Sequence, residues 1–249
     1  MSIEIKNLDY IYRKGTPFEF HALRSISLKI NNGEFIGVIG DEGSGKSTLI
    51  QHINGLLKPG SGDVIFDGIN LNGKGIDLRN IRLKTGFLFQ NPEHQLFADT
   101  VYDDIAFAAR QLGHDEDDIE NRVMRVMDAI GLDFVMYKDR SPFGLSSGEQ
   151  RRVAIAGVIV NNPSILVLDD PIVGLDSFSK EKISTEILRL HRDSKVTIIY
   201  ATHNIDEIYR WADTIYILKN GRITLSGPPG EILSYRKIHY MNKDELVAI

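Results

Sequence analysis

The chain contains no cysteine, and this absence excludes several kinds of site. Disulfide frameworks, zinc fingers and iron–sulfur clusters all depend on cysteine. The seven histidines are scattered without the spacing of a transition-metal site. Positive charge is also in short supply, since the net charge is −5. That balance disfavours a protein held on nucleic acid by a basic face.

Long apolar runs are missing as well. The longest candidate, 153–160, is far shorter than the roughly 20 residues that a membrane span needs. The first residues, 1–6, show no apolar signal segment. We therefore expect the chain to stay on the cytoplasmic side. Its 249 residues, 42% of them hydrophobic, predict one large domain or one domain with an inserted lobe.

One glycine-rich stretch organises the rest of the chain. An apolar run at 35–39 precedes it and predicts a buried strand, and a helical pattern at 48–53 follows it. Strand, glycine loop and helix in this order are typical of a phosphate-binding loop. The loop reads Gly40-Asp41-Glu42-Gly43-Ser44-Gly45-Lys46-Ser47-Thr48.

The residues of this loop suit a polyphosphate. Glycines let successive backbone N–H groups point inward, and the helix N-terminus adds further donors. Lys46 supplies a cation for the β- and γ-phosphates, and Ser47 offers a hydroxyl to Mg²⁺. We expect the side chains of Asp41 and Glu42 to face outward, because carboxylates would repel phosphate. A glycine turn that binds nothing is the alternative, and it requires the flanking elements and the Lys-Ser pair to be coincidental.

Polar residues follow three further buried strands, predicted at 86–90, 165–170 and 196–200. In a parallel sheet, ligands bind beyond the carboxyl ends of the strands, so we expect these residues to converge on the phosphates. Asp169 fits the carboxylate that holds Mg²⁺, and Asp170 could orient or deprotonate the attacking water. Gln90 could contact Mg²⁺ or that water, and His203 the γ-phosphate. As alternatives, the two aspartates could form a turn, Gln90 could cap a loop, and His203 could be an ordinary half-buried histidine.

Other patterns outline the remaining elements. Segments 3–8 and 23–30 alternate apolar and polar residues as half-buried strands do. We predict a hairpin turn at 31–33 into the strand at 35–39, a mixed sheet, and a second hairpin through Asn220-Gly221. Helices are predicted at 101–112, from the acidic run 115–118 to Gly131, and at 146–160. Tyr10 or Tyr12 could stack on a nucleotide base, with ordinary packing as the alternative.

Taken together, these motifs resemble an ABC-type ATPase over nearly the whole chain. The loop 40–48 matches Walker A, 165–170 matches Walker B, and Gln90 matches the Q-loop. Segment 145–150 resembles the signature motif, 174–176 the D-loop, and His203 the switch histidine. Tyr12 matches the base-stacking aromatic of the family. The resemblance implies an α/β P-loop NTPase fold with a mixed core sheet, an antiparallel β subdomain and an inserted α-helical subdomain.

The resemblance also implies residue roles and a division of the chain. ATP and Mg²⁺ are the implied cofactors, with the metal held by Ser47, Gln90 and Asp169 and catalysis carried by Asp170, His203 and Gln90. The signature residues would contact ATP bound by the opposite subunit, and Asp176 would lie at that interface; the signature residues are Ser146, Ser147, Gly148 and Glu149. The nucleotide-binding core would span 1–94 and 161–230, the helical subdomain 95–160, and a short tail 231–249.

A narrower likeness lies in segments 89–97 and 15–18. They are similar to the ATPases of energy-coupling factor (ECF) transporters, which import vitamins or nickel and cobalt ions. That likeness implies a second ATPase, a transmembrane scaffold subunit and a membrane substrate-binding subunit as partners, and no nucleic acid. The chain would then lie at the cytoplasmic face of the cell membrane, peripheral through its partners.

Three positions depart from the family pattern. Ser147 replaces a glycine of the signature, Glu149 replaces its glutamine, and Asp170 stands where the family has a catalytic glutamate. We interpret this as one half of a heterodimer with a weak site of its own, and a homodimer is the alternative. The rival functions are the ATPase of a non-ECF importer, a soluble ABC-type ATPase acting on nucleic acid or ribosomes, and a nucleotide-binding subunit that barely hydrolyses. Against the soluble class, the chain has no long coiled coil and room for one ATPase domain only.

Overall fold

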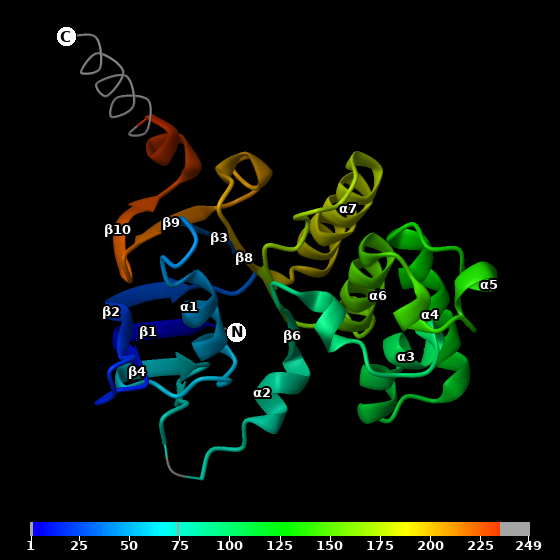
Figure 1. Ribbon diagram of the computed structural model, residues 1–249, viewed down its shortest axis with the longest axis horizontal. Helices are drawn as coiled ribbons and strands as arrows, with labels where there is room; N and C mark the ends of the chain where they lie inside the picture. Colours follow the sequence, from blue (N-terminus) through cyan, green and yellow to red (C-terminus); the bar gives the residue numbers. More distant parts are fainter. Residues whose placement is uncertain (1, 74, 235–249) are drawn as a thin grey trace. The chain divides into compact units, whose positions relative to one another are not determined.

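The computed structural model describes residues 2–73 and 75–234 (Figure 1). The chain divides into two compact units, one made of Met1–Ile76 and Ile199–Ile249 and the other of Asp77–Ile198. These boundaries differ from the functional division at 94/95 and 160/161, which stays a prediction. Most of the predicted tail, 235–249, lies outside the described residues.

An antiparallel sheet forms the N-terminal part of the first unit. Its strand order is β2-β1-β4-β5. In the β1–β2 pair, Ile3 lies opposite Ile30 and Ile5 opposite Leu28, so apolar side chains of both strands share one buried face. This sheet is the antiparallel β subdomain expected from the sequence. The strands are β1 (Ile3–Tyr12), β2 (Phe20–Ile30), β4 (Ser61–Phe66) and β5 (Ile69–Asn70).

A second, mixed sheet carries the glycine loop in the same unit. Strand β3 lies between β9, to which it is parallel, and β8, while β10 runs antiparallel to β9. Asn220 and Gly221 both have positive φ, as the tight turn between β9 and β10 requires. The elements are β3 (Phe35–Ile39), α1 (Lys46–Ile53), β8 (Thr197–Thr202), η3 (Ile205–Glu207), β9 (Thr214–Lys219) and β10 (Arg222–Gly227).

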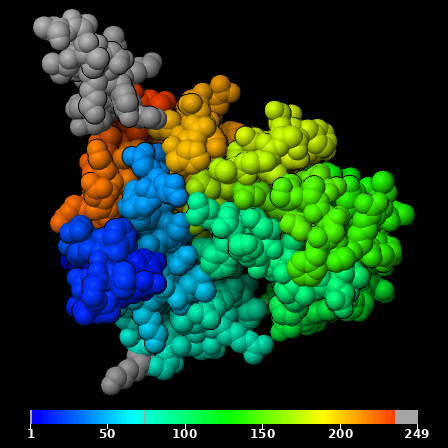
Figure 2. All heavy atoms as spheres, viewed as in Figure 1, coloured from blue at the N-terminus to red at the C-terminus, as the bar shows by residue number. Residues whose placement is uncertain are grey.

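Segments far apart in the sequence meet in this unit. The N–H of Arg24, on β2, donates to the carbonyl of Gly221 at 2.8 Å, so β2 and the β9–β10 turn lie side by side. The blue and orange surfaces of Figure 2 show the same neighbourhood of the N- and C-terminal strands. The glycine loop is thus held between two sheets of one compact unit.

The hairpin predicted at 31–33 is wrong. The turn itself exists, because Gly33 has φ 73° and the N–H of Glu34 donates to Asn31 at 3.3 Å. Its two flanking strands, however, belong to different sheets: β2 pairs with β1, and β3 pairs with β9. A turn fixes the local change of direction and leaves the pairing of the flanking strands to their apolar faces. Strand β3 is buried on both faces, as a central parallel strand is.

The second unit is mainly helical around two parallel strands. Strand β6 pairs with β7 in parallel, and helices α3, α4 and α6 begin at side-chain caps, with Thr100, Asp115 and Ser146 each accepting from a first-turn N–H. Helix α7 was not among the predicted elements. The elements are α2 (Arg79–Lys84), β6 (Thr85–Leu88), η1 (Pro92–Gln95), α3 (Val101–Gln111), α4 (Glu116–Ala129), α5 (Phe134–Tyr137), η2 (Pro142–Gly144), α6 (Ser147–Ile159), β7 (Ile165–Asp169) and α7 (Ser177–Ser194).

Candidate functional site

The loop between β3 and α1 is closed by its own lysine. The Nζ of Lys46 donates to the carbonyl of Gly40 at 2.7 Å and to that of Asp41 at 3.0 Å. The lysine is 7% exposed, although it carries a charge. A buried ammonium group needs acceptors. The two carbonyls therefore fold the side chain back over the loop, with its charge at the place where a phosphate would bind.

Two glycines of the loop are required by close packing. A Cβ on Gly40 would lie 2.4 Å from the carbonyl oxygen of Leu218, and one on Gly45 would lie 2.7 Å from that of Ala22. Gly45 also has φ 107°, a backbone conformation that side chains disfavour. Both contacts are with backbone atoms that cannot swing away. The loop therefore keeps its tight curl only with glycine at these positions.

The loop also fits an anionic ligand. The hydroxyl of Ser44 is buried and has no hydrogen-bond partner among the described residues. The first N–H groups of α1 have no intrahelical acceptor, as at every helix start. The side chains of Asp41 and Glu42 are exposed, in agreement with the expected outward orientation. Cation, orphan hydroxyl and helix start together make a site for phosphate, and Ser47 is the hydroxyl there that could hold Mg²⁺.

Tyr12 and His203 belong to the same unit as the loop. Tyr12 ends β1, is half-buried, and its hydroxyl lies 3.2 Å from Oγ1 of Thr48 in the first turn of α1. His203 directly follows β8 and is exposed. The N–H of Gly40 donates to the carbonyl of Thr202 at 3.3 Å, so the chain before His203 is tied to the start of the loop.

Gln90, Asp169 and Asp170 belong to the second unit. Leu88 lies opposite Leu168 in the β6–β7 pair, so Gln90 and the two aspartates leave neighbouring strands at the same edge. Asp169 and Asp170 are both buried, at 2% and 6% exposure. The structure thus places these three residues at one edge of the β6–β7 pair. Their convergence with the loop 40–48 joins residues of two units and stays a prediction.

Arg151 of α6 is a further residue of this edge that was not predicted from the sequence. Its Nη1 donates to the carbonyl of Asp170 and its Nη2 to that of Gln90, both at 3.1 Å. The carboxylate of Glu93 lies 3.9 Å from Nη2. Burial lowers the pKa of Arg151, and the charges of Glu93 and Asp170 act in the opposite direction. The pair Arg151-Arg152 after the signature was the available signal, but nothing local predicts which backbone an arginine will reach.

The signature segment begins α6 with a capping box. Oγ of Ser146 accepts from the N–H of Glu149, whose carboxylate accepts from the N–H of Ser146 at 2.8 Å and from its hydroxyl at 2.7 Å. The hydroxyl of Tyr137 donates to the same carboxylate at 2.7 Å. These donors lower the pKa of Glu149, with the Ser146 hydroxyl as the largest cause. The unexpected glutamate is therefore ionised and serves as a cap.

Asp176 has a local role as well. It caps α7, accepting from the N–H of Ser179 at 2.9 Å and from its hydroxyl at 2.7 Å. The Ser179 hydroxyl is the largest cause that lowers the pKa of Asp176. Gly174, two residues earlier, has φ 77°. The cap of Asp176 and the positive φ of Gly174 form the turn into α7. The expected place of Asp176 at a subunit interface stays a prediction.

Within residues 2–73 and 75–234, no three histidine or acidic side chains are grouped as a metal site would need. In the same ranges, no helix is both long and apolar enough to cross a membrane.

Known proteins resemble this chain closely. The family model described as ABC transporter matches residues 23–173. The chain is 46% identical over 243 residues to the energy-coupling factor transporter ATP-binding protein EcfA2 of Clostridium perfringens, covering 98% of this chain and 85% of that protein. It is 47% identical over 232 residues to EcfA2 of Clostridioides difficile, covering 93% and 81% respectively.

Solved structures agree with this relationship. The structure of cbiO1 from Clostridium perfringens, described as part of the ABC transporter complex cbiONQ, has a TM-score of 0.79 and 36% identity, covering 95% of this chain and 92% of that one. The ATP-binding cassette MJ0796, solved as a dimer bound to ADP and Pi, has a TM-score of 0.83 and 30% identity, covering 91% and 98%. The loop 40–48 is suited to phosphate, in agreement with these relatives. The chain therefore belongs to the ATP-binding subunits of the ABC transporter family, in the group of ECF transporter ATPases.

Proposed function

We propose that this chain binds and hydrolyses ATP to energise an ECF-type membrane importer for vitamins or nickel and cobalt ions. The observation that carries the proposal is the loop 40–48, where a buried lysine, an orphan serine hydroxyl and a helix start face the same place. The ECF assignment is supported by relatives that share almost half of the sequence.

The residue roles follow the chemistry of phosphoryl transfer. Lys46 and the loop N–H groups would hold the phosphates, and Ser47, Gln90 and Asp169 would hold Mg²⁺, which neutralises the charge developing on them. Asp170 would orient the attacking water, and His203 would contact the γ-phosphate. Buried carboxylates at the end of β7 support these roles, because hard oxygen ligands suit Mg²⁺.

A second ATPase subunit completes the proposed site. The start of α6 keeps the N–H groups of Ser147 and Gly148 for an anion, and we propose that these serve ATP held by the partner subunit. Asp176 would then lie at the shared interface. A heterodimer is favoured because Glu149 and Asp170 both depart from the family pattern, whereas a homodimer would carry both departures in each of its sites.

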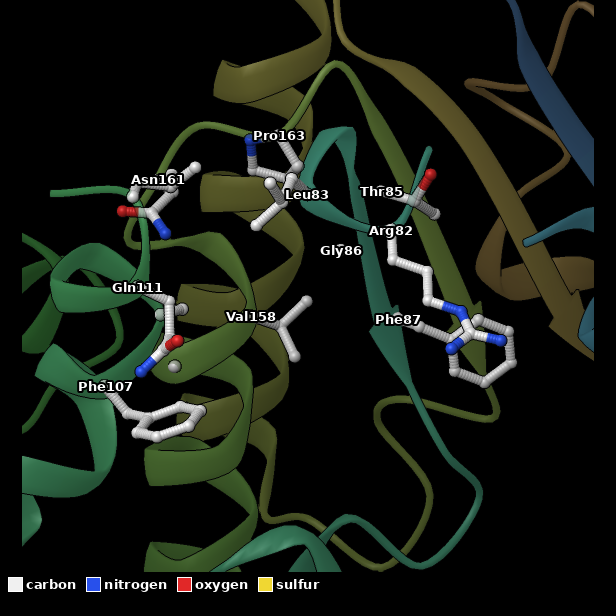
Figure 3. A pocket seen from close by; sticks show the side chains of 13 residues that line it. Arg82, Leu83, Thr85, Gly86, Phe87, Phe107, Gln111, Val158, Asn161 and Pro163 are labelled. Atoms are coloured by element: carbon white, nitrogen blue, oxygen red, sulfur yellow. The ribbon is translucent and has the colours of Figure 1, made fainter. Parts of the chain in front are cut away.

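A membrane partner would dock on the second unit. We propose segment 90–101, after β6, as the docking region. It contains Phe97, whose ring centroid lies 4.8 Å from that of Phe107 on α3, and the two residues are 58% and 45% exposed. Phe107 also lines a hollow of about 280 Å³. Figure 3 shows Phe107, Gln111 and Val158 around it. This apolar area supports a transmembrane scaffold subunit as partner, and with it a peripheral location at the cytoplasmic face.

The test is the substitution Lys46→Ala in the transporter complex purified with its membrane subunits. We expect ATP hydrolysis to be lost and ATP binding to weaken while the thermal midpoint of the isolated chain is little changed. Lys29→Ala, at an exposed position of β2, is the matched control and should behave as wild type. Hydrolysis near the wild-type rate in the Lys46→Ala complex would contradict the proposal.

A further inference from the structure

The ring expected to bind the base is tied to the helix that binds the phosphates. Tyr12 lies at the end of β1 and Thr48 in the first turn of α1, 36 residues further along the chain. Their hydroxyl oxygens are 3.2 Å apart, and the contact is partly buried. Thr48 itself is 8% exposed. The contact therefore joins two elements of the first unit at the place where they flank the loop.

A second tyrosine, Tyr10, packs against Tyr12 and also contacts His52. The ring of Tyr10 meets that of Tyr12 edge-on, with centroids 4.8 Å apart and an interplanar angle of 87°. The same ring meets His52 at 4.8 Å and 76°. Such edge-to-face contacts favour one orientation of each ring. Tyr12 is thus restrained both at its ring and at its hydroxyl.

His52 is also hydrogen-bonded to the backbone of Thr48. Its Nδ1 lies 2.7 Å from the carbonyl oxygen of Thr48, and a carbonyl can only accept, so Nδ1 carries the proton. His52 is 1% exposed, and burial is the largest cause that lowers its pKa. The neutral ring is therefore the form that fits the site at neutral pH. Side chain and backbone of Thr48 are both fixed to the aromatic group.

We propose that Thr48 is a positioning residue for base recognition, whose hydroxyl fixes the ring of Tyr12 relative to the phosphate-binding helix. This inference rests on the proposed binding of ATP and on the expectation from the sequence that Tyr12 stacks on the base. When Tyr12 donates, the hydroxyl of Thr48 keeps its own proton for a phosphate oxygen, and the two bonds strengthen each other. A ring held in place before ATP arrives loses less freedom on binding.

The expected effect can be stated as a ratio of affinities. Base preference is the dissociation constant of Mg²⁺-tripolyphosphate divided by that of Mg²⁺-ATP, both measured on the purified full chain. A neutral hydrogen bond is worth about three- to tenfold in such a ratio. A general loss of structure would weaken both ligands and leave the ratio unchanged, so the ratio separates positioning from stability.

The experiment is a double-mutant cycle of Tyr12→Phe and Thr48→Val. Tyr12→Phe keeps the ring and Thr48→Val keeps the side-chain shape, so each removes one end of the contact. We expect each single variant to lower the base preference about three- to tenfold and the double variant to lower it no further. Thr48→Ser, which keeps the hydroxyl, should stay near wild type.

Tyr216→Phe is the matched control. It removes a tyrosine hydroxyl of the same unit, which donates to the carbonyl of Lys29 at 3.1 Å and does not contact Tyr12 or Thr48, and the ratio should not change. An unchanged ratio in Thr48→Val, or effects that multiply in the double variant, would overturn the proposal. Failure of the proposed function looks different: wild-type chain would show no base preference, or Tyr12→Ala would bind ATP as well as wild type.

Discussion

The Glu149 carboxylate stabilises the start of α6 but would repel a phosphate bound there. Its carboxylate takes both the hydroxyl and the N–H of Ser146, two donors that a phosphate at the start of α6 would otherwise use. The hydroxyl of Tyr137 holds the Glu149 carboxylate in place. The lowered pKa of Glu149 keeps this carboxylate charged at neutral pH. In the proposed dimer, ATP of the partner subunit would approach an anion already seated at this helix start.

Glu149→Gln should therefore strengthen the composite site. Glutamine also fits a capping box, so α6 stays capped while the charge is removed. Two unit charges about 4 Å apart in water repel by about 1 kcal/mol, which corresponds to roughly fivefold in affinity. We expect the apparent KM for ATP of the purified complex to fall by about twofold to fivefold at low salt and by less at high salt.

The control for this charge change is Asp117→Asn, in the first turn of α4, where the ABC fold gives no nucleotide role. It should leave the KM unchanged. A higher KM in Glu149→Gln would mean that the carboxylate supports the nucleotide site through its cap.

At the residue scale, the sequence predicted what is encoded in consecutive positions. The loop 40–48 could be identified because its glycines, lysine and serine stand at the fixed spacing of a phosphate-binding loop. Arg151 could not, because its acceptors are carbonyls of residues 61 and 19 positions away. The contact of Tyr12 with Thr48 was hidden for the same reason: it depends on where β1 ends relative to α1.

At the scale of elements, α6 connects the signature segment to the ends of strands β6 and β7 in its own unit. Arg151 stands one turn after the capping box and donates to backbone carbonyls that follow β6 and β7. Asp170 has φ 46°, an unusual conformation for a residue other than glycine. Such strain persists where the surroundings hold it. The Asp170 carbonyl accepts from Nη1 of Arg151 and from the N–H of Val173, so Arg151 helps to hold this conformation.

Arg151→Gln should therefore reduce kcat of the purified complex more than it changes ATP binding. A displacement of about 1 Å at a reacting group costs roughly 10²-fold, so we expect a ten- to hundredfold loss. Arg152→Gln is the matched control, because Arg152 donates to the carbonyl of Gly131, away from β6 and β7. A smaller loss in Arg151→Gln than in Arg152→Gln would contradict the role of Arg151.

Elements with strong local signals were predicted well, and pairings were not. Helix α4 has Asp115 as its N-cap and is followed by Gly131 with φ 77°, as the acidic run and the glycine indicated. The turn at 31–33 was recognised, but its strands separate into two sheets. Turn residues act over a few positions, whereas strand pairing depends on faces that are buried only when the whole chain has folded.

For the whole molecule, the proposed pairing of two ATPase subunits makes the two sites unequal. Each site would combine the loop of one chain with the signature of the other. The site on this chain's loop would use Asp170, which is one methylene shorter than the glutamate found there in the family. A positioned base is worth about 10²–10⁴-fold, so a carboxylate that reaches the attacking water poorly would slow that site strongly.

We therefore predict that the site on this chain's loop binds ATP well and hydrolyses it slowly, while the other site supplies most of the turnover. In the reconstituted heterodimer, Asp170→Asn should reduce steady-state hydrolysis only modestly, whereas neutralising the equivalent carboxylate of the partner should nearly abolish it. Asp170→Glu restores the missing methylene and should raise turnover. If Asp170→Asn alone abolishes hydrolysis, the left-handed backbone at φ 46° already brings the shorter side chain to the water, and both sites are competent.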